Sequence, residues 1–169
     1  MRIEPATADD INEIRAAYAN GRETQRGVGS PVWPEFTAVA ILHEISAGRL
    51  FLVLDDEVTA GVFSVAHEDP AIWRELERGT HLYLHRIARA ADWNGRGLMD
   101  VILSWAVGEC HSLRREGIRI DTWASNAELI AFYQGRGFTL VGHRHIGVDS
   151  RLPPHYHHNE LALLEHSVP

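Results

Sequence analysis

Cysteine and long apolar runs are the features most clearly missing from this sequence of 169 residues. The single cysteine, Cys110, excludes an internal disulfide and every metal motif built from paired cysteines. No stretch approaches the roughly 20 apolar residues that cross a bilayer, and the N-terminal segment MRIEPATADD lacks the apolar core of a signal peptide. We therefore expect a cytoplasmic protein with no membrane partner.

An excess of positive charge is missing as well. The chain contains 16 Lys and Arg against 23 Asp and Glu, which gives a formal net charge of −7 at pH 7. Because nucleic-acid-binding proteins usually carry a basic stripe, we expect no nucleic-acid partner, whereas a cationic amine is compatible with this balance. Hydrophobic residues at 45% and charged residues at 23% are typical of a globular chain, and the length predicts one domain spanning residues 1–169.

The spacing of apolar residues predicts a mixed α/β fold. Helices are predicted at Thr7–Tyr18 (ended by Asn20-Gly21), around Ile41–Ile45, within Glu68–Thr80, at Leu98–Trp105 and at Leu129–Tyr133. A hairpin is predicted around the turn Asp55-Asp56-Glu57, and further strands at His81–Ala88, Ile118–Trp123, Phe138–Val148 and Leu161–Glu165. Ser125 and Glu128 resemble a capping box for the last helix. This order favours a mixed sheet with helices on both faces.

A glycine-rich corner, DWNGRGLM at residues 92–99, joins a predicted strand to a predicted helix. The first amides of a helix are unpaired and carry a partial positive charge, so glycines there let a phosphate approach the backbone. Asp100 stands where a dinucleotide fingerprint requires a third glycine, and the Gly-Lys-Ser/Thr of a Walker A loop is absent. By itself the corner leaves two interpretations, a phosphate cradle or an ordinary turn.

Together with a second motif downstream, this corner resembles the acyl-CoA pyrophosphate loop of the GNAT superfamily of acyl-CoA N-acyltransferases. The second motif is IRIDTWASNAELIAFYQGRGFTLVG, in which Asn126, Tyr133, Gly137 and Phe138 take the family's positions. The predicted order of elements is similar to the family fold over nearly the whole chain. The resemblance implies a central, mostly antiparallel sheet with a splayed pair of strands and helices on both faces.

The resemblance also implies an activity, that of an N-acetyltransferase which moves an acetyl group from acetyl-CoA to a primary amine by direct attack. The acceptor is then a small-molecule or peptide amine, whose identity the sequence does not disclose. A non-catalytic acyl-CoA-binding sensor, which needs the glycine cradle but no acid or base, is the alternative. Many relatives pair through edge strands or the C-terminal hairpin, so a homodimer stays open.

For the cofactor, the resemblance implies contacts from the predicted strand, the corner and the second motif. Ile87, Ala88 and Arg89 would line the pantetheine arm, with the Ile87 N–H as donor to the thioester carbonyl. The remaining expected contacts are Trp93, Asn94, Gly95, Arg96, Gly97, Leu98, Met99, Asn126 and Tyr133. Asp92 departs from the family's Gln or Arg at the first loop position and would repel a pyrophosphate unless it points away. Arg96 offers a compensating positive charge.

For catalysis, the resemblance places Tyr133 at the family's general-acid position. A phenol with a pKa near ~10 stays protonated at neutral pH and can donate to a leaving thiolate. The base is left open between His85, Asp121 and a water chain. His85 has an intrinsic pKa near ~6.5, which suits proton uptake, but a histidine hydrogen-bonded inside the sheet is an equal alternative.

Trp33, Trp73 and Arg86 are the expected substrate contacts. The two tryptophans fall where the family places its substrate-covering elements, and aromatic rings can enclose an amine by cation–π contact. The alternative for both is a core position, which is the commoner environment of tryptophan. Arg86 is either a substrate-orienting residue or a member of an ion pair.

Histidines gather near the C-terminus, at positions 143, 145, 155, 157 and 158. Imidazole is a frequent metal ligand, yet no carboxylate or cysteine stands at a recognised ligand spacing. We expect no metal, and instead a solvated hairpin or a wall of the substrate cleft. Cys110 beside His111 resembles a catalytic pair, but neighbouring helical residues point in different directions, so we expect Cys110 to be a small buried residue.

Overall fold

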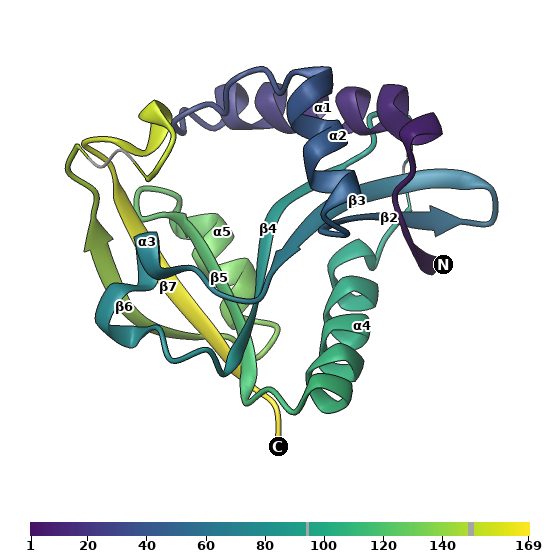
Figure 1. Cartoon of the computed structure of the whole chain (residues 1–169). Helices are drawn as coiled ribbons and strands as arrows, with labels where there is room; N and C mark the ends of the chain where they lie inside the picture. Colours follow the sequence, from purple (N-terminus) through teal and green to yellow (C-terminus); the bar gives the residue numbers. More distant parts are fainter. Residues whose placement is uncertain (94, 149–150) are drawn as a thin grey trace.

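A computed structural model describes residues 1–93, 95–148 and 151–169 of the chain (Figure 1). The strands are β1 (Arg2–Pro5), β2 (Leu50–Asp55), β3 (Val58–Ala66), β4 (His81–Arg89), β5 (Gly117–Trp123), β6 (Thr139–His145) and β7 (Glu160–Ser167). The helices are α1 (Ile11–Gly27), α2 (Ala38–Ser46), α3 (Pro70–Trp73), α4 (Leu98–Leu113) and α5 (Ala127–Gln134). Short 3-10 turns lie at Ala8–Asp10, Arg74–Leu76 and Pro154–Tyr156.

The strands form one seven-stranded sheet in the order β1-β2-β3-β4-β5-β7-β6. Each pair of neighbours is antiparallel except β4 and β5, which are parallel. The expected α/β fold with a mostly antiparallel mixed sheet is therefore confirmed. None of the helices formed by the described residues combines the length and apolarity needed to span a bilayer.

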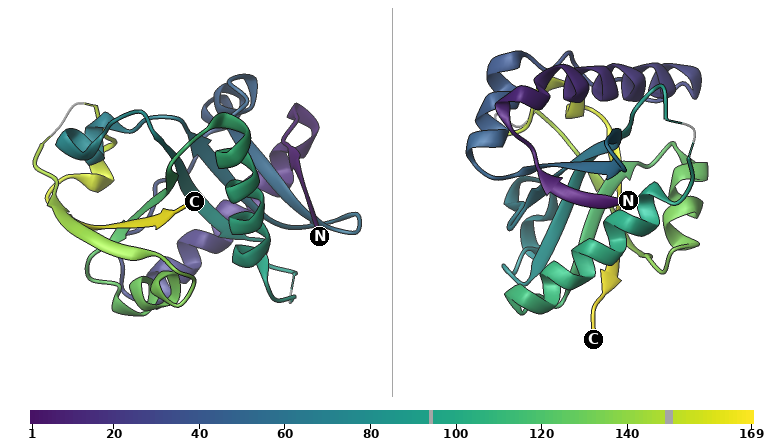
Figure 2. Two further views of the ribbon diagram at one scale, coloured as in Figure 1. Left: turned by 90° about the horizontal axis from the view of Figure 1, so that it is seen from below. Right: turned by 90° about the vertical axis from the view of Figure 1, so that its right-hand side faces the viewer.

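Helices cover both faces of this sheet, as expected (Figure 2). On one face α4 and α5 pack on the strands, and Phe63 of β3 shares a core with Ile102 of α4. On the other face Val62, the neighbour of Phe63, shares a core with Ile14 of α1. The alternation of successive side chains along a strand explains this division. Further along that second face, Trp73 of α3 packs with strand residues of β4, β5 and β7.

The expected end of the first helix at Asn20-Gly21 is wrong, because α1 continues to Gly27. Gly21 lies where the helix packs closely on its neighbours. A Cβ at this position would come within 3.0 Å of the Trp33 ring and 3.5 Å of the Ala88 Cβ on β4. The glycine therefore serves close helix–sheet packing, which local sequence signals do not distinguish from a helix stop.

Two further local expectations need correction. The edge strand β1 was not expected, since it is short, mostly exposed and contains a proline, a residue that sheets tolerate at their edges. The helix α5 is capped by Asn126 rather than by Ser125, because Oδ1 of Asn126 accepts the N–H of Leu129 at 3.0 Å.

The parallel strands β4 and β5 separate along their length. Their pairing is limited to His81–Gly117, Leu82–Ile118 and Tyr83–Arg119, and beyond this point the two strands diverge (Figure 1). The expected splayed pair is therefore present. Strands that stop pairing leave backbone donors and acceptors facing the gap, where an extended ligand can pair with them.

Candidate active site

A cavity of about 580 Å³ opens between the diverging ends of β4 and β5. Its walls come from residues 84–89 of β4, residues 120–123 of β5, α5, the second half of α1 and the loop that follows α1. The residues expected to line a pantetheine arm, Ile87, Ala88 and Arg89, all lie in this wall. The volume is within the range of small-molecule sites.

A β-bulge shapes the β4 wall of the cavity. Val62 and Ser64 of β3 pair with Ala88 and His85, so β4 has one more residue than β3 between the two pairs. The extra residue is accommodated at Arg86, whose φ is positive at 51°. The residue expected to donate its N–H to the acyl group, Ile87, directly follows the bulge.

The side chain of Arg86 holds this bulge against α2. Its guanidinium donates to Glu44 at 2.8 Å and to Oγ of Ser64 at 3.2 Å. Burial acts to raise the pKa of Glu44, but the guanidinium groups of Arg49 and Arg86 outweigh it, so the pKa is lowered. Arg86 also lines the cavity, so it both forms the ion pair and faces the space where a substrate would lie.

The corner before α4 has the geometry of an anion cradle. Gly97 has a φ of 82°, and its carbonyl accepts the N–H of Val101 at 3.0 Å as the first helical hydrogen bond. The amides at positions 98–100 precede that bond and lack an intrahelical acceptor. A Cβ on Gly95 would lie 2.2 Å from the Trp93 ring. The corner therefore favours glycine at both positions, and its unpaired amides have an arrangement that can bind an anion.

Three side chains expected to contact the cofactor, those of Trp93, Leu98 and Met99, pack toward the core between the corner and the sheet. Trp93 is 7% exposed, and its indole N–H donates to Asp55 at 2.9 Å. Leu98 packs toward Gly61 of β3, and Met99 is 5% exposed in the core. Apolar burial of these side chains anchors α4 to the sheet, and their contact with the cofactor stays a prediction.

The charged residues around the corner differ in their pairing. Asp92 and Arg96 are exposed, so Asp92 is free to turn toward solvent. Asp100, at the first turn of α4, accepts from Arg136 of the segment after α5 at 2.7 Å, and this ion pair offsets its negative charge. Asn94, also expected to bind the cofactor, lies outside the described residues.

Asn126 and Tyr133 bring the two ends of α5 to the cavity wall. Asn126 caps the helix through its Oδ1, and its Nδ2 lies 3.5 Å from Oγ of Ser30, another residue of the cavity wall. The same side chain can therefore cap α5 and line the cavity. Tyr133 is 7% exposed and packs against Phe138. Burial raises the pKa of its phenol, which keeps the hydroxyl protonated at neutral pH.

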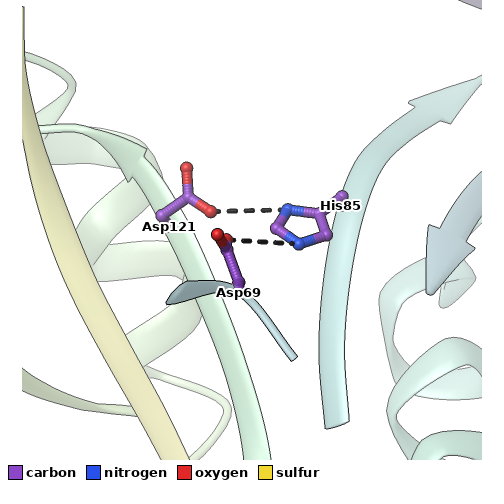
Figure 3. A group of neighbouring side chains, drawn as sticks. All are labelled: Asp69, His85 and Asp121. Atoms are coloured by element: carbon purple, nitrogen blue, oxygen red, sulfur yellow. Dashed lines mark ion pairs between the residues drawn. The ribbon is translucent and has the colours of Figure 1, made fainter. Parts of the chain in front are cut away.

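His85 and Asp121 face each other across the splay, together with a residue that the sequence did not indicate (Figure 3). Nδ1 of His85 lies 3.4 Å from Oδ1 of Asp121, and Nε2 lies 3.6 Å from Oδ2 of Asp69. Burial opposes the charged ring, but the two carboxylates outweigh it and raise the pKa of His85. Burial also raises the pKa of Asp69, to about 6.

Asp69 was missed because its signal is purely local. Asp69-Pro70 is a helix start, an N-cap followed by a proline at the first helical position, and this could have located α3 more closely. Nothing in that pattern tells which strand the second carboxylate oxygen faces.

The two tryptophans expected at the substrate have different environments. Trp33 lies in the cavity wall and contacts Tyr18 and Phe36. Trp73 is fully buried at 0% exposure, with the guanidinium of Arg119 4.4 Å from its ring centroid. The expected substrate contact of Trp73 is wrong, because its large apolar surface is used in the core between α3 and the sheet.

The remaining candidates lie elsewhere. Cys110 is buried in α4, as expected, and its thiol donates to the carbonyl of Gly117 at 3.5 Å, while His111 is exposed. Within the described ranges, the group with metal-ligand spacing is Asp69, His85 and Asp121, whose ligand atoms lie within 4.8 Å of one another. The C-terminal histidines form no such group among the described residues.

Comparison with known proteins agrees with this geometry. Residues 12–138 match the model of the acetyltransferase (GNAT) family. A protein of Bacillus subtilis, named as the uncharacterized N-acetyltransferase YesJ, is 27% identical over 146 residues, which cover 82% of this chain and 81% of that protein. The chain therefore belongs to the acetyltransferase (GNAT) family, and it is an acyl-CoA-dependent N-acetyltransferase.

Solved structures show the same fold. A GNAT-family acetyltransferase from Listeria monocytogenes superposes with a TM-score of 0.73 at 20% identity, covering 98% of this chain and 94% of that one. The putative acetyltransferase yncA from Salmonella typhimurium, solved with its cofactor acetyl-CoA, superposes with a TM-score of 0.65 at 16% identity, covering 100% of this chain and 94% of that one. GNAT acetyltransferases use acetyl-CoA and act on small-molecule or peptide amines.

Proposed function

We propose that this protein transfers an acetyl group to a primary amine by direct attack on acetyl-CoA, which supplies the acetyl group as a thioester. The observation that carries the proposal is the cavity between β4 and β5, whose wall contains Tyr133, His85, Asp121 and the backbone at Ile87. A general acid, a proton acceptor and a backbone donor therefore surround one space, and each has a separate task in acyl transfer.

Tyr133 is the proposed general acid. Tyr133 lines the cavity and is largely buried, and the raised pKa keeps its hydroxyl protonated. A protonated phenol can donate to a sulfur that leaves as a thiolate. The backbone at Ile87, beside the bulge at Arg86, is the proposed donor to the acyl oxygen, and residues 87–89 are the proposed wall of the pantetheine arm.

Asp121 and His85 are the proposed proton acceptors for the attacking amine. An alkylammonium has a pKa near ~10 and must lose a proton before it attacks. Asp121 lines the cavity, while its Oδ1 is buried and lies 3.4 Å from Nδ1 of His85. A carboxylate in that position attracts an ammonium ion and can take its proton. Trp33 and Arg86 are the proposed contacts of the remainder of the acceptor.

Direct attack is favoured over a covalent acyl-enzyme by the position of the only cysteine. Cys110 is buried in α4 against the carbonyl of Gly117, and burial raises the pKa of its thiol to about 11. A thiol must ionise to act as a nucleophile, so this cysteine cannot carry the acetyl group.

Acetyl transfer to a panel of primary amines tests the proposal. Release of coenzyme A and the mass of the acetylated amine are measured together, with the heat of acetyl-CoA binding recorded by calorimetry. The 16 Lys and Arg residues of the chain are all Arg, so its own side chains present no primary amine and self-acetylation gives little background. Binding of acetyl-CoA without transfer to any amine would instead favour the non-catalytic sensor.

A further inference from the structure

Each ring nitrogen of His85 faces a different carboxylate (Figure 3). Asp121 approaches Nδ1 from β5, on the side of the cavity, at 3.4 Å. Asp69 approaches Nε2 from the start of α3 at 3.6 Å and is not part of the cavity wall. The His85 ring therefore connects Asp121, which lines the cavity where a substrate would lie, with Asp69, which does not line it.

We propose that Asp121, His85 and Asp69 form a proton relay, in which the proton of the acceptor ammonium enters at Asp121 and leaves through His85 to Asp69. This inference rests on the proposed function, because it requires an amine that must be deprotonated. Asp69 acts through His85 and is thus a positioning and proton-accepting residue that does not touch the substrate.

The local structure fixes Asp69 in this orientation. Its Oδ1 accepts the N–H of Ile72 at 3.3 Å as the cap of α3, and its own backbone N–H donates to Glu77 at 2.7 Å. With one oxygen held by the helix, the other is directed at the His85 ring. Tyr83 stacks on the same ring, with centroids 6.4 Å apart and planes 10° from parallel, which limits rotation of the imidazole.

The transfer balances without any further reactant. The N–H bond of the ammonium breaks, its electron pair stays on nitrogen, and the proton passes to the Asp121 carboxylate. Asp121 then protonates Nδ1 of His85 as Nε2 releases its proton to Asp69, because imidazole can gain a proton at one nitrogen while losing one at the other. Asp69 keeps 12% of its side chain exposed, and Glu68 and Pro70 beside it are exposed, so water can take the proton from there.

The electrostatics of the cluster match this role. The two carboxylates raise the pKa of His85 in spite of its burial, so they stabilise the positive charge that the ring gains while a proton passes through it. Burial raises the pKa of Asp69 to about 6, which allows its carboxylate to accept a proton close to neutral pH. Among the described residues, the other charged or titratable groups that face the cluster are Tyr83 and Arg86 on β4, Glu77 beside α3, Tyr133 on α5 and Tyr156 in the C-terminal 3-10 turn.

The same three residues also have the spacing of metal ligands. The arrangement of the ring favours proton transfer over metal binding, because the carboxylates lie against opposite nitrogens, whereas a single ion would need both beside one nitrogen. Metal binding is therefore kept as an outcome of the test.

Asp69→Asn is the decisive variant. Asparagine caps a helix as well as aspartate does, so α3 is retained while the charge that faces Nε2 is removed. We expect kcat to fall about 10- to 100-fold with the KM for acetyl-CoA unchanged, and the acid limb of the rate profile, near pH 6 in the wild type, to disappear. NMR titration of the His85 ring without substrates should show that its pKa is lower than in the wild type.

Two controls separate the relay from a structural effect. Glu75→Gln makes the same chemical change in the same segment, at a residue that pairs with Arg144 at 2.6 Å and does not face His85, and it should leave rate and pH profile unchanged. Asp69→Ser, a second neutral cap, should behave like Asp69→Asn, with thermal unfolding confirming that both variants fold.

Each result decides one point. If transfer occurs in the wild type but Asp69→Asn keeps its pH profile and the His85 pKa, the relay is wrong and the proposed function stands. If Zn²⁺ binds the wild type stoichiometrically by calorimetry and Asp69→Asn abolishes that binding, the cluster is a metal site and the relay is overturned. If the wild type acetylates no amine, the proposed function fails and the relay fails with it.

Discussion

The indole ring of Trp93 lies against the backbone of Gly95 so closely that a Cβ on Gly95 would come within 2.2 Å of Cζ2 of the ring. Trp93 is held there by its hydrogen bond to Asp55. The turn before α4 is thus anchored to the end of β2 through Trp93. Packing in the core therefore fixes the direction of the first amides of α4. A rigid cradle of this kind loses little entropy when it binds an anion.

Alanine at Gly95 or Gly97 should therefore weaken acetyl-CoA binding. Gly95→Ala must displace the Trp93 ring, and Gly97→Ala introduces a side chain at a φ of 82°, which costs about 1–2 kcal/mol. We expect the Kd for acetyl-CoA to rise about tenfold, equivalent to about 1.4 kcal/mol, as measured by calorimetry. Gly108→Ala is the matched control, because a Cβ there meets no atom within 4 Å and should stabilise α4 by about 0.5–1 kcal/mol. Unchanged affinity in both corner variants would contradict the cradle.

Replacing Tyr133 by phenylalanine should slow turnover and spare binding. The substitution removes only the hydroxyl, and the ring keeps its packing against Phe138. We expect kcat to fall about 100-fold, the low end for loss of a general acid, with the Kd for acetyl-CoA within about threefold of wild type. Tyr156→Phe, another tyrosine of the cavity wall, is the control and should retain most of the rate. A large loss of kcat in Tyr156→Phe, with no loss in Tyr133→Phe, would identify Tyr156 as the general acid.

Glu44→Gln should destabilise the fold in a pH-dependent manner. The folded-state pKa of Glu44 is lowered by Arg49 and Arg86, so its contribution is present above the unfolded value near ~4.3 and is lost as the pH falls through the folded value. We expect a loss of about 1.5 kcal/mol at pH 7 that shrinks toward zero at pH 3, measured by urea unfolding.

The exposed pair of Glu23 and Arg26 provides the comparison for that measurement. The Glu23 side chain is 71% exposed, and exposed pairs contribute little because solvent screens them. Glu23→Gln should therefore leave stability unchanged within error at both pH values. An equal loss for Glu44→Gln at pH 7 and pH 3 would mean that packing, and not charge, explains its effect.

The thiol of Cys110 should be unreactive in the folded protein. It is buried, and its pKa is raised to about 11 by burial, so the reactive thiolate is scarce at neutral pH. Ellman's reagent should label the native chain at least about 100-fold more slowly than the chain in guanidinium, where one thiol per chain reacts. Rapid labelling of the native protein would show that α4 opens locally, and would also interfere with detection of released coenzyme A.

The order of elements and the cofactor corner could be predicted from the sequence because their signals are local. Helical and strand spacing depend on residues within one or two turns, and the corner is recognised by two glycines followed by an apolar helix. The same locality explains the errors. Gly21 carries the signal of a helix end, yet its lack of a side chain serves the contact with Trp33, a residue that is distant in the sequence.

The sequence by itself determined the mixed sheet, the glycines before α4 and the presence of Tyr133 on the helix after β5, since each follows from neighbouring residues. Only the tertiary structure decided that Trp73 belongs to the core and that Asp69 meets His85 and Asp121. Those three side chains come from α3, β4 and β5, and they converge because β4 and β5 stop pairing after Tyr83 while the segment of α3 packs across the gap. Such a meeting depends on the sum of many packing contacts, which no local pattern records.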